Sequence, residues 1–233
     1  MRTRREKILD ITREEIKITA RSLMAEKGTA GLSIRAIARE MKMSAPALYH
    51  YYDSLNELIT ALIQDAFVRL ADAQEAVAND PQWQNELERL TAVASSYRQW
   101  ALDNPIDFQL IYGNPIPNYE QPTEVTYPPA RRSFILTASI IANGIEKGEI
   151  VLPETYRNFP EKIEQSLAAL TQIEGHDLPH SALYLAASAW AKIHGFVMLE
   201  LFHLIQPVIG NVDEFFQYEL TQFLKNIDAS AED

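Results

Sequence analysis

Residues 33–52 read SIRAIAREMKMSAPALYHYY and hold two short helical patterns joined by a brief turn. Ser44 is a good N-cap for the second pattern, because its hydroxyl can accept a hydrogen bond from a free backbone N–H. Pro46 falls in the first helical turn, where no intrahelical N–H bond is lost. Leu48 and Tyr52, four residues apart, then lie on one side of that helix. The apolar face of the first pattern is made by Ile34, Ile37, Ala38 and Met41.

The other residues of the second pattern face outward and are small, aromatic or hydrogen-bonding. A short helix that buries one edge and shows such groups on the other suits a DNA major groove. A helical hairpin within an all-α core would give the same spacing, so spacing alone leaves both interpretations open. The outward set is Ala45, Pro46, Ala47, Tyr49, His50 and Tyr51.

Residues 12–66 resemble the DNA-binding domain of the TetR family of transcriptional regulators. The resemblance implies a helix-turn-helix head that binds double-stranded operator DNA. It is carried, at fixed spacing, by Ala25-Glu26-Lys27-Gly28, by Leu32 to Ala38, by Ser44 to Tyr52, and by Leu58 at the opening of a long helix.

The resemblance assigns base contacts to two places. Arg35 matches a position from which family members reach a base or a phosphate, and a guanidinium can hold guanine O6 and N7 with two hydrogen bonds. Ala45, Pro46 and Ala47 match base-facing positions of the recognition helix. Because these side chains are small and apolar, they can only touch thymine methyl groups or let the backbone approach the DNA.

Phosphate contacts are implied for three ring side chains and two serines. Tyr49, His50 and Tyr51 match positions that donate to phosphates, and His50 is also a candidate to reach a base. Ser33 and Ser44 stand at helix N-termini, where hydroxyl and backbone N–H groups can donate to a phosphate.

Leu55 stands where the family usually has a lysine at the start of the fourth helix. This departure removes one expected phosphate contact, for which Arg39, Lys42 or the basic N-terminal arm can substitute. Specificity then depends heavily on Arg35 and His50, and on the shape of the DNA.

The composition of the 233 residues suits a helical protein with a real core, since 47 % are hydrophobic and only 8 are glycine. The formal net charge is −11, yet residues 1–60 hold eleven Lys and Arg against eight Asp and Glu. Phosphate binding needs a positive charge on one face of the protein and not a positive net charge.

The chain has no cysteine, which excludes disulfides and cysteine-based metal sites. With no signal peptide and no uncharged apolar stretch of roughly 20 residues, we expect a soluble cytoplasmic protein without membrane contact.

The first helix is predicted to begin at Thr12, which can form a capping box with Glu15, and to end at Gly28. Residues 1–11 would then be a basic arm, either solvated and partly disordered or in contact with phosphates.

A further capping box, Ser54 with Glu57, starts a helix that can run to about Asn79, because Asp80-Pro81 stops it. This helix is too long for a three-helix head alone. Its far half must therefore enter a second domain and link the two mechanically.

The second half of the chain is predicted to be helical throughout, with an irregular proline-containing loop over residues 113–128 that could fold over a pocket mouth. The long helix from Pro179 is apolar nearly all round and must be covered on most sides. The predicted helices are Trp83–Asp103, Pro105–Tyr112, Pro129–Lys147, Glu161–Glu174, Pro179–Ile205 and Val212–Ile227.

The segment from Trp190 to Gly195 resembles the Trp-x-x-x-His-Gly signature of one C-terminal domain subgroup in the same family. We expect an effector pocket near it, with a core role as the open alternative for each candidate residue. The aromatic, mainly uncharged character of the candidates suggests a hydrophobic or aromatic effector. They are Trp100, Phe108, Tyr112, Phe134, Trp190 and His194.

Catalytic and metal-binding patterns are weak. Glu200 and His203 have the Glu-x-x-His spacing of di-iron bundles, but the second copy that such sites need is missing. A glycine-rich phosphate loop and a nucleophile elbow are also missing. We therefore expect no metal, no cofactor and no enzymatic activity. A helical small-molecule-binding protein or enzyme with a vestigial DNA-binding head stays open, supported only by Leu55 and the acidic net charge.

The predicted fold is all-α, with a helix-turn-helix domain over residues 1–57 and a helical effector-binding and dimerisation domain over residues 58–233. The predicted function is that of a homodimeric repressor released from operator DNA by a small molecule, and activation instead of repression is left open. The dimer is expected through the last two helices, as the resemblance implies.

Overall fold

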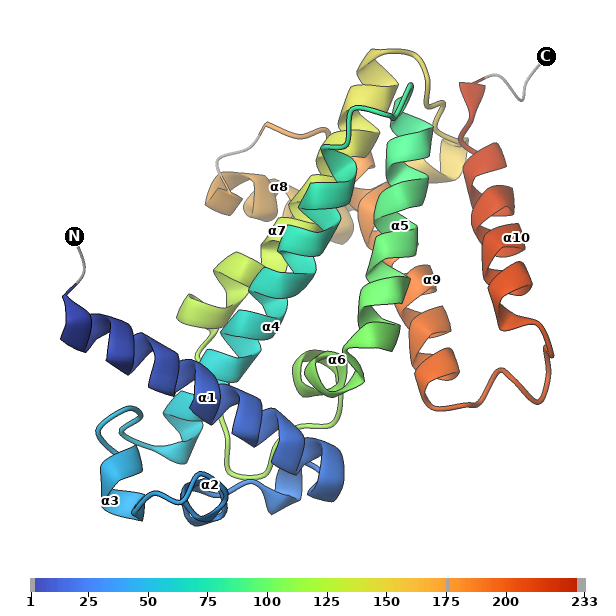
Figure 1. Cartoon of the computed structure of the whole chain (residues 1–233). Helices are drawn as coiled ribbons and strands as arrows, with labels where there is room; N and C mark the ends of the chain where they lie inside the picture. Colours follow the sequence, from blue (N-terminus) through green and yellow to red (C-terminus); the bar gives the residue numbers. More distant parts are fainter. Residues whose placement is uncertain (1–2, 175–176, 230–233) are drawn as a thin grey trace. The chain divides into compact units, whose positions relative to one another are not determined.

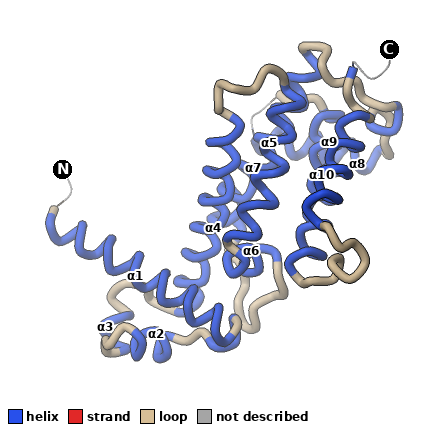
Figure 2. The backbone as a smooth tube through the Cα atoms, turned by 45° about the vertical axis from the view of Figure 1, so that its right-hand side comes forward, coloured by secondary structure: helices blue, strands red, loops and turns tan. Residues whose placement is uncertain are grey.

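The computed structural model describes residues 3–174 and 177–229. Within these ranges the chain forms ten α-helices and two 3₁₀ turns, with no β-strand, so the predicted all-α fold is confirmed (Figure 1; Figure 2). The chain divides into two compact units. The first unit comprises residues 1–69 and 104–129, and the second comprises residues 70–103 and 130–233.

The first unit contains four complete helices and the first parts of two longer ones. The predicted domain boundary after residue 57 falls inside this unit, just after α4 begins. Its complete helices are α1 (Arg4–Lys27), α2 (Ile34–Glu40), α3 (Ala45–Leu48) and α6 (Pro105–Tyr112), and the parts belong to α4 (Leu55–Ala78) and α7 (Thr123–Glu146).

The start of α1 corrects the sequence prediction. The helix begins at Arg4 and not after Thr12, because Thr3 and Glu6 form a capping box of their own. The Glu6 N–H donates to Thr3 Oγ1 at 3.3 Å, and the Thr3 N–H donates to the Glu6 carboxylate at 2.7 Å. No Gly or Pro separates this box from Thr12, so the helix continues through it to the predicted end at Gly28. The basic residues after Thr3 are therefore helical and do not form an irregular arm.

The start of α7 also differs from the prediction. The helix begins at Thr123, six residues before the predicted start, and contains Pro128 and Pro129. A proline cannot donate to the carbonyl four residues before it. For Pro129 that carbonyl belongs to Val125, and Gln64 Nε2 of α4 donates to it at 3.0 Å. This side chain replaces the missing helical hydrogen bond, so residues 123–128 are not wholly loop.

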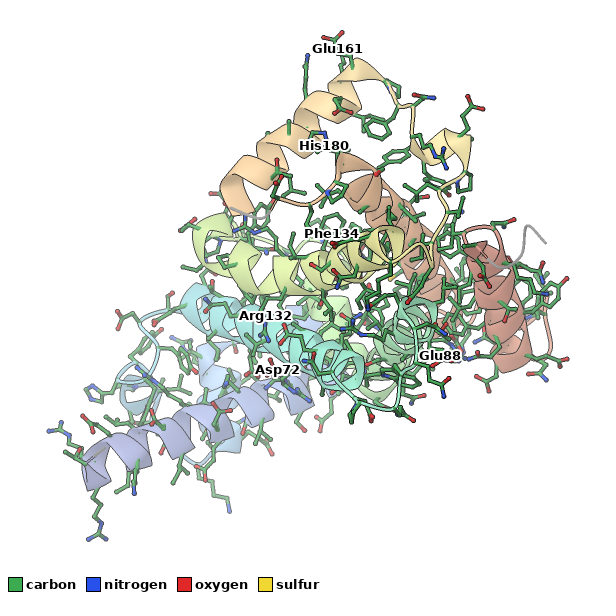
Figure 3. All side chains as sticks on the ribbon, turned by 90° about the horizontal axis from the view of Figure 1, so that it is seen from above. Asp72, Glu88, Arg132, Phe134, Glu161 and His180 are labelled. Atoms are coloured by element: carbon green, nitrogen blue, oxygen red, sulfur yellow. The ribbon has the colours of Figure 1, made fainter. Side chains whose placement is uncertain are left out.

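The second unit is built from the end of α4, most of α7, and the remaining helices α5 (Glu86–Asp103), α8 (Glu161–Glu174), α9 (His180–Leu201) and α10 (Val212–Lys225). Its core joins residues of α5, α7, α8 and α9, including Ile140, Ile141, Leu183 and Leu185, all nearly inaccessible to solvent. At its edge Arg132 of α7 donates to Glu75 Oε1 at 2.9 Å and to Asp72 Oδ1 at 2.6 Å, which fixes α7 against the end of α4 (Figure 3).

The end of α9 falls at Leu201, four residues before the predicted end. His203 adopts a left-handed conformation (φ 57°), and the Leu204 N–H donates to the Leu199 carbonyl at 2.8 Å. With the His203 N–H donating to the Glu200 carbonyl at 3.0 Å, these bonds form a Schellman motif, in which glycine usually occupies the left-handed position. A histidine at that position gives no sequence signal for a helix end.

A buried ion-pair network joins α5, α9 and α10. Arg98 Nε donates to Glu200 Oε2 at 2.7 Å, and the Arg98 guanidinium also bonds Asp213 at the start of α10. The hydrogen bond that Arg98 donates to Glu200 is the main cause that raises the pKa of Arg98, against an opposing effect of burial. Glu200 is thus committed to a structural ion pair. Its spacing from His203 reflects a helix end, and no cluster of metal-ligating residues is found among the described residues.

Candidate nucleic-acid interface

Two serines set the starts of α2 and α3 as predicted. The Ala36 N–H donates to Ser33 Oγ at 3.1 Å, and the Ala47 N–H donates to Ser44 Oγ at 3.3 Å. Between the helices Lys42 takes a left-handed conformation (φ 55°), and the Met43 N–H donates to the Ala38 carbonyl at 2.8 Å. The turn is therefore tight, as the spacing of the two helical patterns requires.

The apolar residues of both helices are buried on the expected side. Ile37 and Leu48 are fully buried, and Ile34, Ala38 and Tyr52 are nearly so. Their burial leaves the opposite sides of α2 and α3 facing solvent, and α2 packs against α1 and α3.

Each predicted DNA contact lies on the solvent side or at its edge. Tyr49 is 49 % exposed, and the half-buried members Ala45, Ala47 and Tyr51 flank the exposed ones. The exposed candidates are Ser33, Arg35, Ser44, Pro46, Tyr49 and His50. The geometry thus leaves every candidate reachable by a ligand, while its role in DNA contact stays a prediction.

The recognition helix is shorter than its sequence pattern suggests. α3 ends at Leu48, and residues 49–51 follow in turns in which the Tyr51 N–H donates to the Leu48 carbonyl at 2.9 Å. Tyr49 and His50 therefore project from a turn beyond the helix. Leu55 is half-buried as the first residue of α4, whereas Arg39 and Lys42 are exposed cations near it in the chain.

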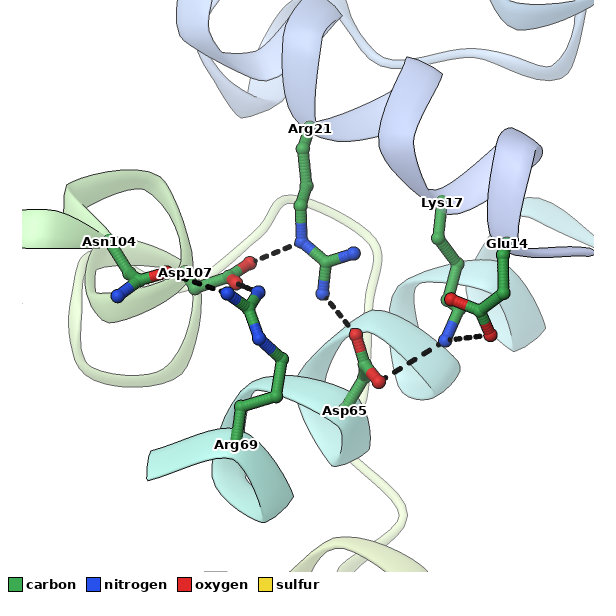
Figure 4. A network of polar contacts seen from close by, with 7 residues as sticks. All are labelled: Glu14, Lys17, Arg21, Asp65, Arg69, Asn104 and Asp107. Carbon is green, nitrogen blue, oxygen red and sulfur yellow. Dashed lines mark hydrogen bonds and ion pairs between the residues drawn. The ribbon is translucent and has the colours of Figure 1, made fainter. Parts of the chain in front are cut away.

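A polar network behind this surface was not predicted from the sequence. Arg21 of α1 donates through Nε to Asp107 Oδ1 of α6 at 2.7 Å and bonds Asp65 of α4 through Nη2 (Figure 4). Arg69 of α4 reaches Asp107 Oδ2 at 2.7 Å, and Lys17 reaches Asp65 at 3.2 Å. Three helices of the first unit are therefore joined by ion pairs.

Positive charge governs the pKa of Asp65 in this network. Burial alone would raise the pKa of Asp65, but hydrogen bonds and positive charge from Arg21 and Lys17 outweigh it, so the pKa lies below its usual value. Asp107 is only 3 % exposed and receives two arginines. The one sequence signal for this network is the spacing of Lys17 and Arg21. They lie four residues apart, beside the buried stripe of α1, but the spacing does not identify their partners.

The effector candidates divide between the two units. In the first unit Phe108 is fully buried, and its ring centroid lies 5.0 Å from that of Tyr112, which in turn meets the edge of Phe67. This arrangement is compatible with the core role that the sequence left open. In the second unit Trp100 is 7 % exposed, and Phe134 packs against the main core.

Trp190 and His194 are brought together as predicted, one turn apart on α9. Their ring centroids are 5.7 Å apart, and Trp190 is 46 % exposed. The Tyr97 hydroxyl lies 2.8 Å from His194 Nδ1, and burial lowers the pKa of the histidine. Tyr97 and His194 thus form one polar pair beside the partly exposed indole of Trp190.

An apolar groove between α9 and α10 was not foreseen. It has a volume of about 530 Å³, and none of the effector candidates lines it. Four phenylalanines line it, together with Lys192 and Glu219. The main lining residues are Ile193, Phe196, Leu199, Phe215, Phe216 and Phe223.

Comparisons with known proteins agree with this architecture. Residues 18–62 match the model of the bacterial regulatory proteins of the tetR family, and residues 90–223 match a tetracyclin repressor-like C-terminal domain. The chain is 34 % identical over 187 residues to the HTH-type transcriptional regulator Rv1816 of Mycobacterium tuberculosis, covering 78 % of this chain and 77 % of the relative.

Solved structures give the same fold. A structure of the regulatory protein SCO4313 has a TM-score of 0.77 and 32 % identity, covering 95 % of this chain and 99 % of the other. A Rhodococcus sp. RHA1 protein of unknown function has a TM-score of 0.72 and 23 % identity, covering 93 % of this chain and 95 % of the other. The curated relatives are transcriptional regulators and not enzymes, as the sequence predicts. The chain therefore belongs to the TetR family of bacterial transcriptional regulators, whose members bind DNA through the helix-turn-helix head.

Proposed function

We propose that the protein is a homodimeric repressor that binds operator DNA through α2 and α3 and is released by a small hydrophobic or aromatic effector. The observation that carries the proposal is the solvent-facing side of α2 and α3, which presents every predicted DNA contact while its other side is buried. This surface belongs to residues 1–60, which hold eleven Lys and Arg against eight Asp and Glu, whereas residues 61–233 hold ten against 24.

Base reading falls mainly to Arg35. Its side chain is exposed at the start of α2, where a guanidinium can bond guanine O6 and N7 together. Ala45, Pro46 and Ala47 bring the backbone of α3 close to the groove floor and can touch thymine methyl groups.

Phosphate binding falls to the residues around these contacts. Ser33, Ser44, Tyr49, His50 and Tyr51 supply hydroxyl and ring donors on the same exposed surface. Arg39 and Lys42 supply the positive charge that Leu55 does not.

Dimerisation through α9 and α10 is supported by apolar side chains that a lone chain leaves in water. Leu199 is 44 % exposed, Leu204 61 % and Tyr218 60 %. Where such side chains form one contiguous patch, they mark a site of association. α9 is also long and apolar enough to cross a membrane by length and composition alone. The helix also carries two charged residues, Lys192 and Glu200, and Glu200 is paired with Arg98. These charges suit a helix at a protein interface in a cytoplasmic protein better than a membrane span.

Effector release requires a ligand that favours one conformation over the other. α4 is a single helix that begins in the first unit and ends in the second, so it can carry such a bias along the chain. Trp190 and His194, with Tyr97 as a polar partner, are the proposed contacts in the second unit; Trp100, Phe108, Tyr112 and Phe134 are the other candidates.

The direct test is fluorescence anisotropy with labelled DNA from upstream of the protein's own gene. Arg35→Ala should weaken binding to the specific site by about 1–3 kcal/mol, the cost of a lost bidentate base contact, with far less effect on random DNA. Lys27→Ala is a matched control, because Lys27 is an exposed cation at the far end of α1. Equal losses on specific and random DNA would refute the base-reading role, and no binding at all would refute the function.

A further inference from the structure

The N-terminal half of α1, residues 4–15, buries none of its side chains, and the first buried residue of the helix is Ile16. Two isoleucines of this half face solvent, Ile8 with 53 % and Ile11 with 59 % of their surface exposed. In Figures 1 and 2 these turns extend past α2 and α3 of the same unit. A free helix end with large aliphatic side chains in water is an unpartnered surface.

The exposed isoleucines belong to a regular stripe. Arg4, Ile8, Ile11 and Glu15 follow one another at intervals of four, three and four residues, so they share one face of the helix. This is the spacing of the a and d positions in a helix-to-helix seam. Leu9 lies about 100° around the helix from Ile8 and outside the stripe.

The order of charges along the stripe selects its partner. If a second copy of the stripe is laid against the first in antiparallel orientation, Ile8 meets Ile11 and Arg4 meets Glu15 at both ends. A parallel arrangement would place Arg4 beside Arg4 and Glu15 beside Glu15, which is repulsive. Neither Arg4 nor Glu15 has an ion pair within the described part of the chain. The stripe is therefore complementary to itself in one orientation only.

We propose that residues 4–15 of α1 pair with the same segment of a second copy bound at a neighbouring operator, so that two DNA-bound dimers bind cooperatively. The inference rests on the proposed function. Four isoleucine side chains bury far less than the roughly 1,200 Å² of a stable interface. The contact thus holds together only copies that DNA has already brought close, where the effective concentration is high.

The absence of native cysteine allows a direct test of the geometry. Differently tagged Arg4→Cys and Glu15→Cys proteins are mixed on DNA carrying two adjacent operators and then oxidised. In the antiparallel pair the two engineered sulfurs are adjacent, whereas two copies of the same variant hold theirs about 16 Å apart along the helix, too far for a disulfide. We expect disulfides between unlike variants only, and only on the two-operator DNA.

The energetic test compares one-operator and two-operator DNA. The wild-type chain should show a cooperativity factor on the order of ten, equivalent to about 1.4 kcal/mol. Ile8→Ser with Ile11→Ser should reduce this factor to one while leaving one-operator affinity unchanged, and Leu9→Ser should change neither.

Three results would overturn the inference: disulfides between like variants, disulfides that form equally without DNA or on one operator, or cooperativity that survives loss of both isoleucines. Failure to bind one-operator DNA is a different outcome, because it refutes the proposed function itself.

Discussion

Asp107 accepts two arginines on one carboxylate, and their different burial should set how strongly each is coupled to it. The Asp107 side chain is 3 % exposed; that of Arg21 is 18 % exposed and that of Arg69 is 44 % exposed. Both hydrogen bonds measure 2.7 Å, so distance does not separate them. The difference in burial should separate the two couplings, because water screens an exposed partner and weakens its ion pair.

The magnitudes follow from this difference. A hydrogen bond to a charged group contributes about 1.5–3 kcal/mol when it is well shielded, whereas an exposed ion pair contributes about 0–1 kcal/mol. Asp107→Asn keeps the shape of the side chain and removes its charge. We expect it to lower the free energy of unfolding by about 2 kcal/mol, most of it through Arg21.

Double-mutant cycles measure the two couplings separately. Urea unfolding of the wild type, of Asp107→Asn, of Arg21→Gln and of the double variant should give a coupling energy of about 1.5–2 kcal/mol. The matched cycle with Arg69→Gln should give less than about 1 kcal/mol. Equal couplings, or a larger one for Arg69, would show that burial does not control this network.

Three further predictions address individual residues. His203→Gly should stabilise the chain by about 0.5–1 kcal/mol, because glycine relieves the left-handed strain at the end of α9, and calorimetry should show a higher Tm; an unchanged or lower Tm would contradict this. Because the pKa of Asp65 is lowered in the folded state, its carboxylate stabilises the fold above the unfolded pKa near 4, and this contribution is lost as the pH falls through the folded pKa. Asp65→Asn should therefore flatten the decline of stability below pH 4. A decline of unchanged slope would exclude Asp65 as its source. Thr3→Ala should speed amide exchange in the first turns of α1 without changing global unfolding, since this half of the helix buries nothing; a fall in global stability would mean that these turns belong to the cooperative core.

The sequence was most informative where a residue has a single local role. Ser33 and Ser44 cap the helices that their hydroxyls predict, and Gly28 ends α1 with a positive φ of 68°. The bounds of α8 were predicted without error. In each case the deciding hydrogen bond or backbone angle lies within a few residues of the signal.

Errors arose where a local rule met a competing contact. Thr12 carries the same capping pattern as Thr3, and only the structure shows which of the two starts the helix. Lys42 and His203 take left-handed positions that sequence reasoning reserves for glycine. The pairing of Asp107 with Arg21 spans 86 residues, and periodicity does not carry information over such a distance.

The candidate site followed the same division. Burial of one side of α2 and α3 could be read from helical spacing, so the exposed side was predictable in outline. The early end of α3, which leaves Tyr49 and His50 on a turn, could not be predicted, because no glycine or proline marks it in the sequence.

The two prolines within α7 have a consequence for how that helix opens. Pro128 and Pro129 have no amide hydrogen, so the ladder of backbone hydrogen bonds is interrupted between its first turns and the remainder. The turns before the prolines are secured by a side chain, Gln64, and the turns after them by the core of the second unit. α7 is one ribbon in Figure 1, yet its two ends belong to different compact units, so we expect their amide hydrogens to exchange at different rates.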